Sequence, residues 1–466
     1  MIQLPIPIGR QQEVLYLPAE GHTVVLGTAG SGKTTLAILR AAYLADSSTE
    51  HCGRTLLVTF NRALVTYLRH LRPPEFHNVK VENYHAFARG YLNSQGRMKD
   101  NAILSDPDRR DCLIQEAVKN VSQGYKPHTF FKRPLEIFSD EIQWLQNHGI
   151  ITLEDYKEAD RVGRIKSRID RNLREPMFEI FQEYLSLRQR CSKLYDWYDL
   201  ALHTHQEFQQ DDSERYYRHI VIDEGQDFSP EMIRSLSSAI PKNGSLTFFG
   251  DVAQQIYGQR ISWRTAGLNI QKVWDFKENY RNTKEIAQLG LAISKMPYFT
   301  GVPDMVEPTS PRAAGELPTV IQCKSKKEEI ELVIKLVTTN STLQSVAILF
   351  KNREQEEVIR GKIPHDSIRL HRDMTTWQVG PGIRYGTYHA AKGLEFDMVI
   401  LPFLSNDNLP DANQVAAFGR DEALTRNGRF LYVAVTRAKT RLVITYSGNR
   451  TELLPHNPEL YTEMRG

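Results

Sequence analysis

The sequence has few cysteines and no long apolar run, and both absences narrow the class of protein. Its four cysteines, Cys52, Cys112, Cys191 and Cys323, stand far apart, and no pair has the spacing of a metal site or redox motif. We therefore expect reduced, structural thiols. No run of about 18 apolar residues occurs, which argues against a membrane-spanning helix. The first residues lack the pattern of a signal peptide, so the expected compartment is the cytoplasm.

The chain also lacks a strong excess of charge of either sign. It has 59 Lys and Arg against 56 Asp and Glu, a net charge of +3, so bulk charge alone does not indicate a nucleic-acid partner. With 466 residues and 41% hydrophobic content, it is long and apolar enough for several folded domains.

Short apolar runs alternate with helical periodicity at both ends of the chain. TVVLG, TLLVTF (55–60), RHIVIDE (218–224) and SLTFFGD (245–251) predict buried strands that end in polar residues. A second series follows: LPTVIQCK, SVAILF, RYGTYH, DMVILP and RLVITY. KKEEIELVIKLVTT and RFLYVAVTRA are expected to be helices, and 298–318 a loop. This alternation predicts an α/β fold, with parallel sheets covered by helices on both faces.

The stretch from about 96 to 205 has helical spacing and few strand-like runs, which predicts a helical insert in the first α/β lobe. The expected division is therefore 1–95 and 206–284 for the two parts of the first lobe, 96–205 for the insert, and 285–466 for the second lobe. Ligand-binding groups should gather at the carboxyl ends of the strands.

Residues 27–34, GTAGSGKT, lie between a predicted strand and a predicted helix and fit the G-x-x-x-x-G-K-[ST] pattern. Glycines allow backbone N–H groups to approach phosphates, Lys33 would reach the β- and γ-phosphates, and the Thr34 hydroxyl would bind Mg²⁺. The alternative is a chance glycine-rich turn. The residues expected to hold ATP here are Gly27, Thr28, Ala29, Gly30, Ser31, Gly32, Lys33, Thr34 and Thr35.

A phosphate-binding loop needs a carboxylate to hold its metal ion, and HIVIDEGQDF supplies two after an apolar strand. Asp223 would hold Mg²⁺, and Glu224 would activate the attacking water. The alternative is a solvated acidic turn.

Four further polar clusters follow: FFGDVAQQIYG with Asp251 and Gln254, KENYRNT with Tyr280 and Arg281, TYHAAKGLEF with His389, Lys392, Gly393 and Glu395, and VAVTRAK with Arg437. Singly, each could be a helix cap or a surface ion pair. Together they make sense in one site, in which Arg281 and Arg437 are candidate arginine fingers. Such a finger contributes about 10³ to 10⁵ in rate.

The ordered series RQQEVL, GTAGSGKT, VTFNRAL, ENYHAFA, DEGQD, GDVAQQIY, NYRNT, TYHAAKGLEF and VAVTRAK resembles the UvrD/Rep/PcrA-type helicases of superfamily 1. The resemblance covers residues from about 10 to 450. It implies two RecA-like P-loop NTPase lobes with ATP between them, and ATP-driven movement along single-stranded DNA or a single/double-strand junction, from 3′ to 5′.

The resemblance also implies a role for each matching residue. Gln11 would read the adenine, with Gln12 as the alternative, and Tyr280 would stack on that base. Arg281 and Arg437 would touch the γ-phosphate, Gln254 would sense it, and Gly393 and Glu395 would face the nucleotide. The residues expected to line the strand track are Thr59, Phe60, Asn61, His85, Tyr257 and His389.

The sequence departs from the family pattern in three places. The stretch between Arg281 and Thr387 can complete the second lobe but leaves no room for the large 2B insert, which puts unwinding by this chain alone in doubt. Gln259 stands where many members carry a tryptophan that stacks on DNA, and Trp263 is a possible substitute. Thr35 replaces the usual arginine after the P-loop threonine.

Two segments of the predicted insert have open interpretations. Residues 161–174, RVGRIKSRIDRNLR, with Arg164 and Arg168, would either grip backbone phosphates or form a solvated helix face. KLYDWYDL (193–200) could be a stacking platform, but its spacing favours a core helix.

Other functions also fit the sequence. The chain could be a nucleotide-gated subunit of a defence-type complex with a nuclease partner, and with little unwinding of its own. It could also act on RNA or on hybrids.

Overall fold

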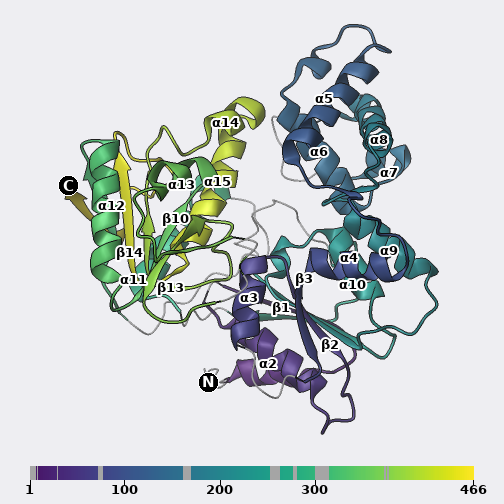
Figure 1. Cartoon of the computed structure of the whole chain (residues 1–466), viewed down its shortest axis with the longest axis horizontal. Helices are drawn as coiled ribbons and strands as arrows, with labels where there is room; N and C mark the ends of the chain where they lie inside the picture. Colours follow the sequence, from purple (N-terminus) through teal and green to yellow (C-terminus); the bar gives the residue numbers. More distant parts are fainter. Residues whose placement is uncertain are drawn as a thin grey trace.

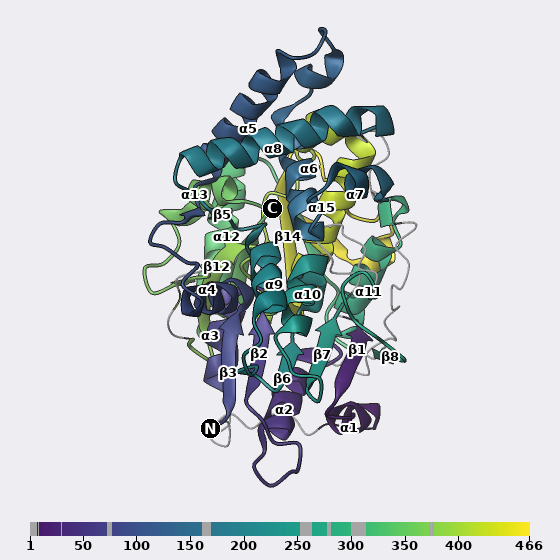
Figure 2. The same ribbon diagram turned by 90° about the vertical axis from the view of Figure 1, so that its right-hand side faces the viewer.

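The computed structural model describes residues 7, 9–28, 30–71, 77–160, 169–251, 263–276, 281–299, 314–371, 374 and 377–466. A six-stranded sheet, in the order β3-β2-β6-β7-β1-β8, forms the centre of the first lobe, and its described pairs are all parallel. Figure 2 shows these strands side by side, with α9 and α10 in front of them. The strands are β1 (Gly21–Gly27), β2 (Thr55–Thr59), β3 (Val79–Asn83), β6 (His219–Ile222), β7 (Ser245–Gly250) and β8 (Val273–Phe276).

Alternating side chains of these strands enter two different cores, as the period of two in a strand requires. Val25 and Leu57 pack on one face with helices α2 and α3, while Val24 and Leu56 pack on the other with α4, α9 and α10. The helices of the first lobe are α1 (Arg10–Leu15), α2 (Lys33–Ala45), α3 (Arg62–Leu71), α4 (Tyr84–Ser94), α9 (Leu200–Gln210) and α10 (Pro230–Ser238).

A second, seven-stranded parallel sheet, in the order β11-β12-β10-β13-β14-β9-β15, forms the second lobe (Figure 1). Its strands are β9 (Thr319–Cys323), β10 (Ser345–Phe350), β11 (Ile368–Arg369), β12 (Gly382–Thr387), β13 (Phe396–Leu401), β14 (Ala438–Ser447) and β15 (Thr462–Arg465). Its helices are α11 (Lys284–Ser294), α12 (Lys326–Asn340), α13 (Arg353–Arg360), α14 (Ala412–Phe418) and α15 (Arg420–Val435). The two lobes share one apolar cluster, which runs from Val25 and Leu64 to Leu394 and Leu431.

Between α4 and α9 the chain forms a helical insert with its own apolar core (Figure 1). Its elements are β4 (Ile103–Leu104), α5 (Pro107–Ser122), α6 (Leu135–His148), α7 (Leu153–Glu158), α8 (Arg174–Arg190) and β5 (Tyr195–Asp196). The insert also contacts the second lobe, because Phe418 of α14 packs into its core and Arg426 Nη1 lies 3.2 Å from Asp140 Oδ1. The short 3-10 helices are η1 (Thr129–Lys132), η2 (Arg171–Leu173), η3 (Gly225–Asp227), η5 (Pro297–Phe299) and η6 (Pro458–Leu460).

The α/β fold class and the nine predicted strands are confirmed. Strands β3, β4, β8, β11 and β15 were not predicted. One predicted helix is wrong: residues 193–200 contain strand β5 and a turn, and α9 begins only at Leu200. The predicted loop at 298–318 and the basic segment 161–174 lie largely outside the described residues. None of the described helices has the length and apolarity needed to cross a membrane.

Candidate functional site

The glycine-rich loop joins β1 to α2 and places Lys33 at the first residue of that helix. Gly30 and Gly32 have φ of 79° and 82°, a left-handed conformation that favours glycine. The Lys33 Nζ atom donates hydrogen bonds to the carbonyl oxygens of Gly27 and Thr28, at 2.9 and 2.6 Å. Loop and lysine therefore lie at the carboxyl end of β1, beside the N-terminus of α2, an arrangement suited to binding phosphate.

Asp223 follows β6 and lies next to Thr34 of α2. Burial and the neighbouring Glu224 raise the pKa of Asp223 to about 7, while a hydrogen bond with Thr34 opposes the shift. The buried Asp223 Oδ2 atom accepts no hydrogen bond from the described residues. A hydroxyl beside an unsatisfied carboxylate oxygen suits Mg²⁺, which binds proteins through one or two carboxylates and takes its other ligands from water and phosphate. Within the described ranges, no group of three His, Cys, Asp or Glu forms a protein-only metal cage.

Glu224 is surrounded by cations from both lobes. Burial alone would raise its pKa, but Lys392, Arg437 and Lys33 together hold the pKa of Glu224 below its usual value. Its φ of 54° is uncommon for a residue other than glycine, and Gln226 donates a hydrogen bond to its carboxylate. Glu224 is therefore ionised and held in place, as a general base must be.

Arg437 follows α15 and lies on the inner side of the second lobe, with a side chain that is fully buried. Its Nε donates to Val433 O at 3.0 Å, and burial, together with Arg281, lowers its pKa to about 10. Glu224 and Asp251 of the first lobe, and Glu395, oppose that shift. The guanidinium thus faces the carboxylates of the first lobe.

Arg281, in the segment that joins the two lobes, forms an ion pair with Glu395, with Arg281 Nη2 2.5 Å from Glu395 Oε1. Nearby, Gly393 has φ of 77°, and a Cβ atom there would lie 2.6 Å from Leu64 Cδ2 of α3. Because Gly393 has no side chain, this part of the second lobe can pack closely against Leu64 of the first lobe. We name Lys33, Asp223, Glu224, Asp251, Arg281, Glu395 and Arg437 the nucleotide cluster.

The N-terminal helix α1 brings Gln11 to the phosphate-binding loop. Gln11 Nε2 donates to Ser31 O at 3.2 Å, whereas Gln12 Nε2 donates to Pro7 O on the surface. The buried Arg40 of α2 fixes this segment, because its guanidinium donates to the carbonyls of Leu15, Leu17 and Pro18 at 2.7 to 2.9 Å. Of these two glutamines, Gln11 therefore contacts the phosphate-binding loop.

A groove of about 540 Å³ opens between the lobes at the carboxyl ends of both sheets. It is lined by Phe60, Asn61, Arg62, Ala63, His85 and Asp227 of the first lobe, by Trp197 of the turn between β5 and α9, and by Arg353, Glu356, Arg369, Leu370, His371, Thr387, His389, Ala390 and Lys392 of the second lobe. Thr59 is fully buried and is not among these residues.

The sequence model of the UvrD/REP helicase N-terminal domain matches residues 8–280, and that of the UvrD-like helicase C-terminal domain matches residues 370–449. The chain belongs to the UvrD/REP helicase family. The two parallel sheets flanked by helices are accordingly its two RecA-like lobes, and ATP-dependent DNA helicase activity is the activity of this family.

Three relatives show how far the similarity extends. A probable DNA helicase of Mycoplasma pneumoniae is 24% identical over 477 residues, which cover 94% of this chain and 83% of the relative. The ATP-dependent DNA helicase UvrD2 of Mycobacterium bovis is 22% identical over 563 residues, covering 95% and 79%. The ATP-dependent DNA helicase PcrA of Leuconostoc citreum is 21% identical, covering 76% and 48%. These relatives do not favour the alternative of a nuclease-partnered subunit.

The structure of the C-terminal domain of a possible DNA helicase from Lactobacillus shares 19% identity and covers 40% of this chain and 98% of its own. Its TM-score is 0.28, so it carries no argument about the fold.

Three aromatic side chains, those of Phe60, His85 and Trp197, lie in a row along one wall of the groove between the lobes. The ring centroids of Phe60 and His85 lie 5.4 Å apart, and those of His85 and Trp197 lie 5.2 Å apart, both nearly edge to face. Burial lowers the pKa of His85 to about 4, so its ring is neutral near pH 7 and its Nε2 donates to Trp197 O at 3.3 Å. Sequence reasoning favoured a core role for the segment of Trp197. Its neighbours Tyr195 and Leu200 are indeed buried, but Trp197 itself lines the groove.

A clasp joins this groove to the nucleotide cluster. Asn61 Nδ2 donates to the carbonyls of Lys392 and Ala390 at 2.8 and 3.2 Å, and Lys392 forms a buried ion pair with Asp227. Lys392 also stabilises the charge of Glu224. Asp227 was missed in the sequence, although it stands three residues after Glu224 in DEGQD.

Several predicted residues lie outside the described part of the chain: Ala29, Arg164, Arg168, Gln254, Tyr257, Gln259 and Tyr280. Thr35 is half-buried in the first turn of α2. Trp263, the suggested substitute for a stacking tryptophan, packs edge to face on Phe248 in the core of the first lobe, with 5.0 Å between centroids.

Proposed function

We propose that this member of the UvrD/REP helicase family couples Mg²⁺-dependent ATP hydrolysis to movement along single-stranded DNA from 3′ to 5′. One observation carries the proposal: buried charges of both lobes meet in the nucleotide cluster, and Lys392 links that cluster to the groove. A change in the spacing of the lobes therefore alters both sites together.

Each residue of the nucleotide cluster has a proposed task. Lys33 and the backbone of residues 27–34 bind the phosphates, and the Thr34 hydroxyl and Asp223 hold Mg²⁺, which would neutralise phosphate charge. Glu224 accepts the proton of the attacking water, and Arg281 and Arg437 stabilise the charge that develops on the γ-phosphate. Gln11, Gly393 and Glu395 are proposed to face the nucleoside, and Gln254 and Tyr280 keep their family roles as proposals.

In the groove, Phe60, His85 and Trp197 present rings to the bases, while Arg62 and Arg353 supply positive charge for the backbone. Stacking on an aromatic ring contributes about 1 to 3 kcal/mol per base. Asn61 and His389 are proposed to line the same track, with Tyr257 and Thr59 retained as proposals from the resemblance.

ATP hydrolysis with and without matched DNA and RNA oligonucleotides tests the proposal. We expect DNA to stimulate hydrolysis, and Lys33→Ala and Glu224→Gln to abolish it. Equal rates with and without nucleic acid would reject the proposal. Greater stimulation by RNA than by DNA would mean that RNA, not DNA, is the preferred nucleic acid. Displacement of streptavidin from the 5′ end but not the 3′ end of a biotinylated strand tests the direction.

Duplex unwinding is a separate question, because the second lobe was predicted to lack the large 2B insert. A forked DNA with a 3′ single-stranded tail measures unwinding directly, and a protein that moves on single strands but leaves the fork intact would support that prediction.

A further inference from the structure

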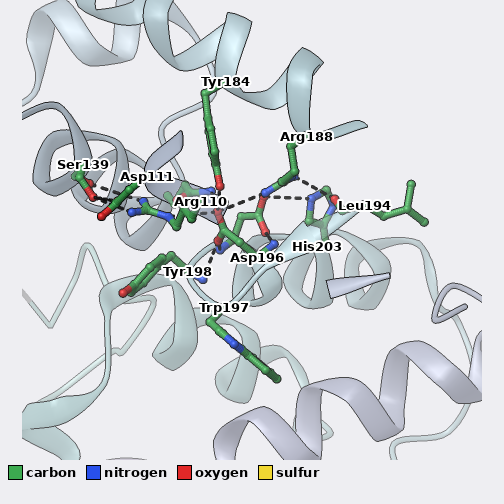
Figure 3. A network of polar contacts seen from close by, with 12 residues as sticks. Arg110, Asp111, Ser139, Tyr184, Arg188, Leu194, Asp196, Trp197, Tyr198 and His203 are labelled. Carbon is green, nitrogen blue, oxygen red and sulfur yellow. Dashed lines mark hydrogen bonds and ion pairs between the residues drawn. The ribbon is translucent and has the colours of Figure 1, made fainter. Parts of the chain in front are cut away.

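A buried polar network surrounds the turn that carries Trp197 (Figure 3). Asp196 and Asp199 lie on either side of the turn, and Arg110 and Arg188 reach them from insert helices α5 and α8. All four residues are at most 7% exposed. We name them the insert cluster. The side chain of Trp197 points away from these contacts (Figure 3) and toward the groove, which it lines.

The two carboxylates fix the backbone on both sides of Trp197. Asp196 Oδ1 accepts hydrogen bonds from the backbone N–H groups of Tyr198 and Asp199, at 2.8 and 3.2 Å. Asp199 Oδ1 accepts in return from the backbone N–H of Asp196 at 2.9 Å. Such reciprocal side-chain to backbone bonds lock a short turn before a helix. The conformation of Trp197 therefore depends on both carboxylates.

The same carboxylates are held by three helices of the insert. Asp196 Oδ2 accepts from Tyr184 Oη of α8 at 2.7 Å and from Gln146 Nε2 of α6 at 2.9 Å. Arg188 Nη1 of α8 donates to Asp199 Oδ2 at 2.5 Å.

Arg110 completes the connection from α5. Its Nε lies 3.8 Å from Asp196 Oδ2, its guanidinium lies 4.8 Å from the ring centroid of Tyr198, and its Nη1 donates to Ser139 Oγ of α6 at 2.7 Å. The hydrogen bonds from other helices to the carboxylates of this turn come from the insert. The first lobe adds His203 of α9, whose Nε2 lies 3.9 Å from Asp199 Oδ2, and His85, which contacts the inner side of the turn through Trp197 O.

We propose that Asp196 is a positioning residue that ties Trp197 to the insert, so that α5, α6 and α8 set the position of the indole against a base of the bound strand. This inference rests on the proposed function. The helices of the insert then act on single-stranded DNA through one turn that borders the groove. Because Phe418 of the second lobe packs on the insert, movement of that lobe also reaches Trp197.

Binding of a fluorescein-labelled oligodeoxythymidine, followed by anisotropy, tests this proposal in a double-mutant cycle. In the otherwise unchanged chain, we expect Asp196→Asn to weaken binding about tenfold, which is within the contribution of one stacked base. In a Trp197→Ala background, we expect the same substitution to change binding less than twofold. Asp212→Asn, an exposed acidic residue beyond α9, is the matched control and should bind as wild type.

The outcomes separate three cases. A tenfold loss that persists in the Trp197→Ala background, or no loss in the unchanged chain, overturns the proposal. If Asp196→Asn does not fold, Tyr184→Phe takes its place, because it removes one hydrogen bond to Asp196 and keeps every charge; we expect about a threefold loss that disappears without Trp197. If the wild-type chain does not bind the oligonucleotide, the result contradicts the proposed function rather than this inference.

Discussion

In the insert cluster, each of the four carboxylate oxygens of Asp196 and Asp199 accepts a hydrogen bond, whereas in the nucleotide cluster Asp223 Oδ2 accepts none from the part of the chain that the structure describes. The first cluster draws its two cations and two carboxylates from the insert and the turn that follows it. The second draws its charges from both lobes. Most residues of the nucleotide cluster, including Asp223, Glu224 and Arg437, are as buried as the insert cluster, so burial alone does not distinguish a structural charge from a functional one.

The two clusters differ in whether each buried charge has its partners within the protein or awaits a ligand. Removing one partner from a buried pair leaves an uncompensated charge and destabilises a protein strongly. Charges that await a ligand are instead held by the surrounding fold, and their loss affects chemistry more than folding. We therefore expect substitutions in the nucleotide cluster to lower the rate of hydrolysis, and substitutions in the insert cluster to lower stability.

The largest effect is expected for Arg437→Ala. Loss of an arginine that stabilises the transferred phosphoryl group lowers the rate by about 10³ or more. The measurement is DNA-stimulated ATP hydrolysis at saturating ATP, with Arg441→Ala, a half-exposed arginine of β14, as the control. If the variant keeps a tenth of the wild-type rate or more, Arg437 does not stabilise the transferred phosphoryl group.

The next effect is on stability and concerns the insert cluster. Arg188→Met removes the cation shared by Asp196 and Asp199 and should lower the free energy of unfolding by about 3 to 5 kcal/mol. Urea denaturation measures the change, and Arg190→Met, on the exposed side of the same helix, should leave the midpoint unchanged. If both variants are equally stable, the insert cluster does not stabilise the fold, and the expected difference between the two clusters is contradicted.

A smaller effect tests the clasp between groove and nucleotide cluster. Asn61→Ala removes hydrogen bonds to the carbonyls of Lys392 and Ala390, each contributing about 1 kcal/mol. We expect the DNA-stimulated fraction of hydrolysis to fall about tenfold, with the DNA-independent rate little changed. Asn93→Ala, at the exposed end of α4, is the control. Equal loss of both rates would mean that Asn61 supports the fold rather than the coupling.

A last, pH-dependent effect uses His219, a buried group of neither cluster, as a reference. Burial lowers its pKa to about 4, below the value of about 6.5 in an unfolded chain, so the unfolded state binds the extra proton between these values. Stability should therefore fall as the pH drops from about 6.5 to 4, by at most about 1.4 kcal/mol per pH unit for this histidine. His219→Gln should flatten a series of melting temperatures over this range. If the melting temperature of the variant falls with pH as steeply as that of the wild type, the lowered pKa of His219 is contradicted.

Features carried by consecutive residues could be predicted from the sequence. The loop at 27–34, the carboxylates after β6 and the place of Arg437 between a helix and a strand all follow from local patterns. The Asp227–Lys392 pair and the contacts of Asn61 could not, because they join residues far apart in the chain. The helix predicted at 193–200 is wrong because two aspartates three residues apart lock a turn, a signal present in the letters YDWYD but overruled by helical spacing.

The apolar cluster that passes from Val25 and Leu64 to Leu394 and Leu431 has a thermodynamic consequence for the motor cycle. Drawing the lobes fully apart would expose this surface to water, at about 2.5 kcal/mol for each 100 Å². The strokes of the cycle are therefore expected to be small rotations over a dry hinge. Any wider opening should carry the positive heat-capacity change of apolar hydration, which makes the temperature dependence of stepping a direct gauge of its amplitude.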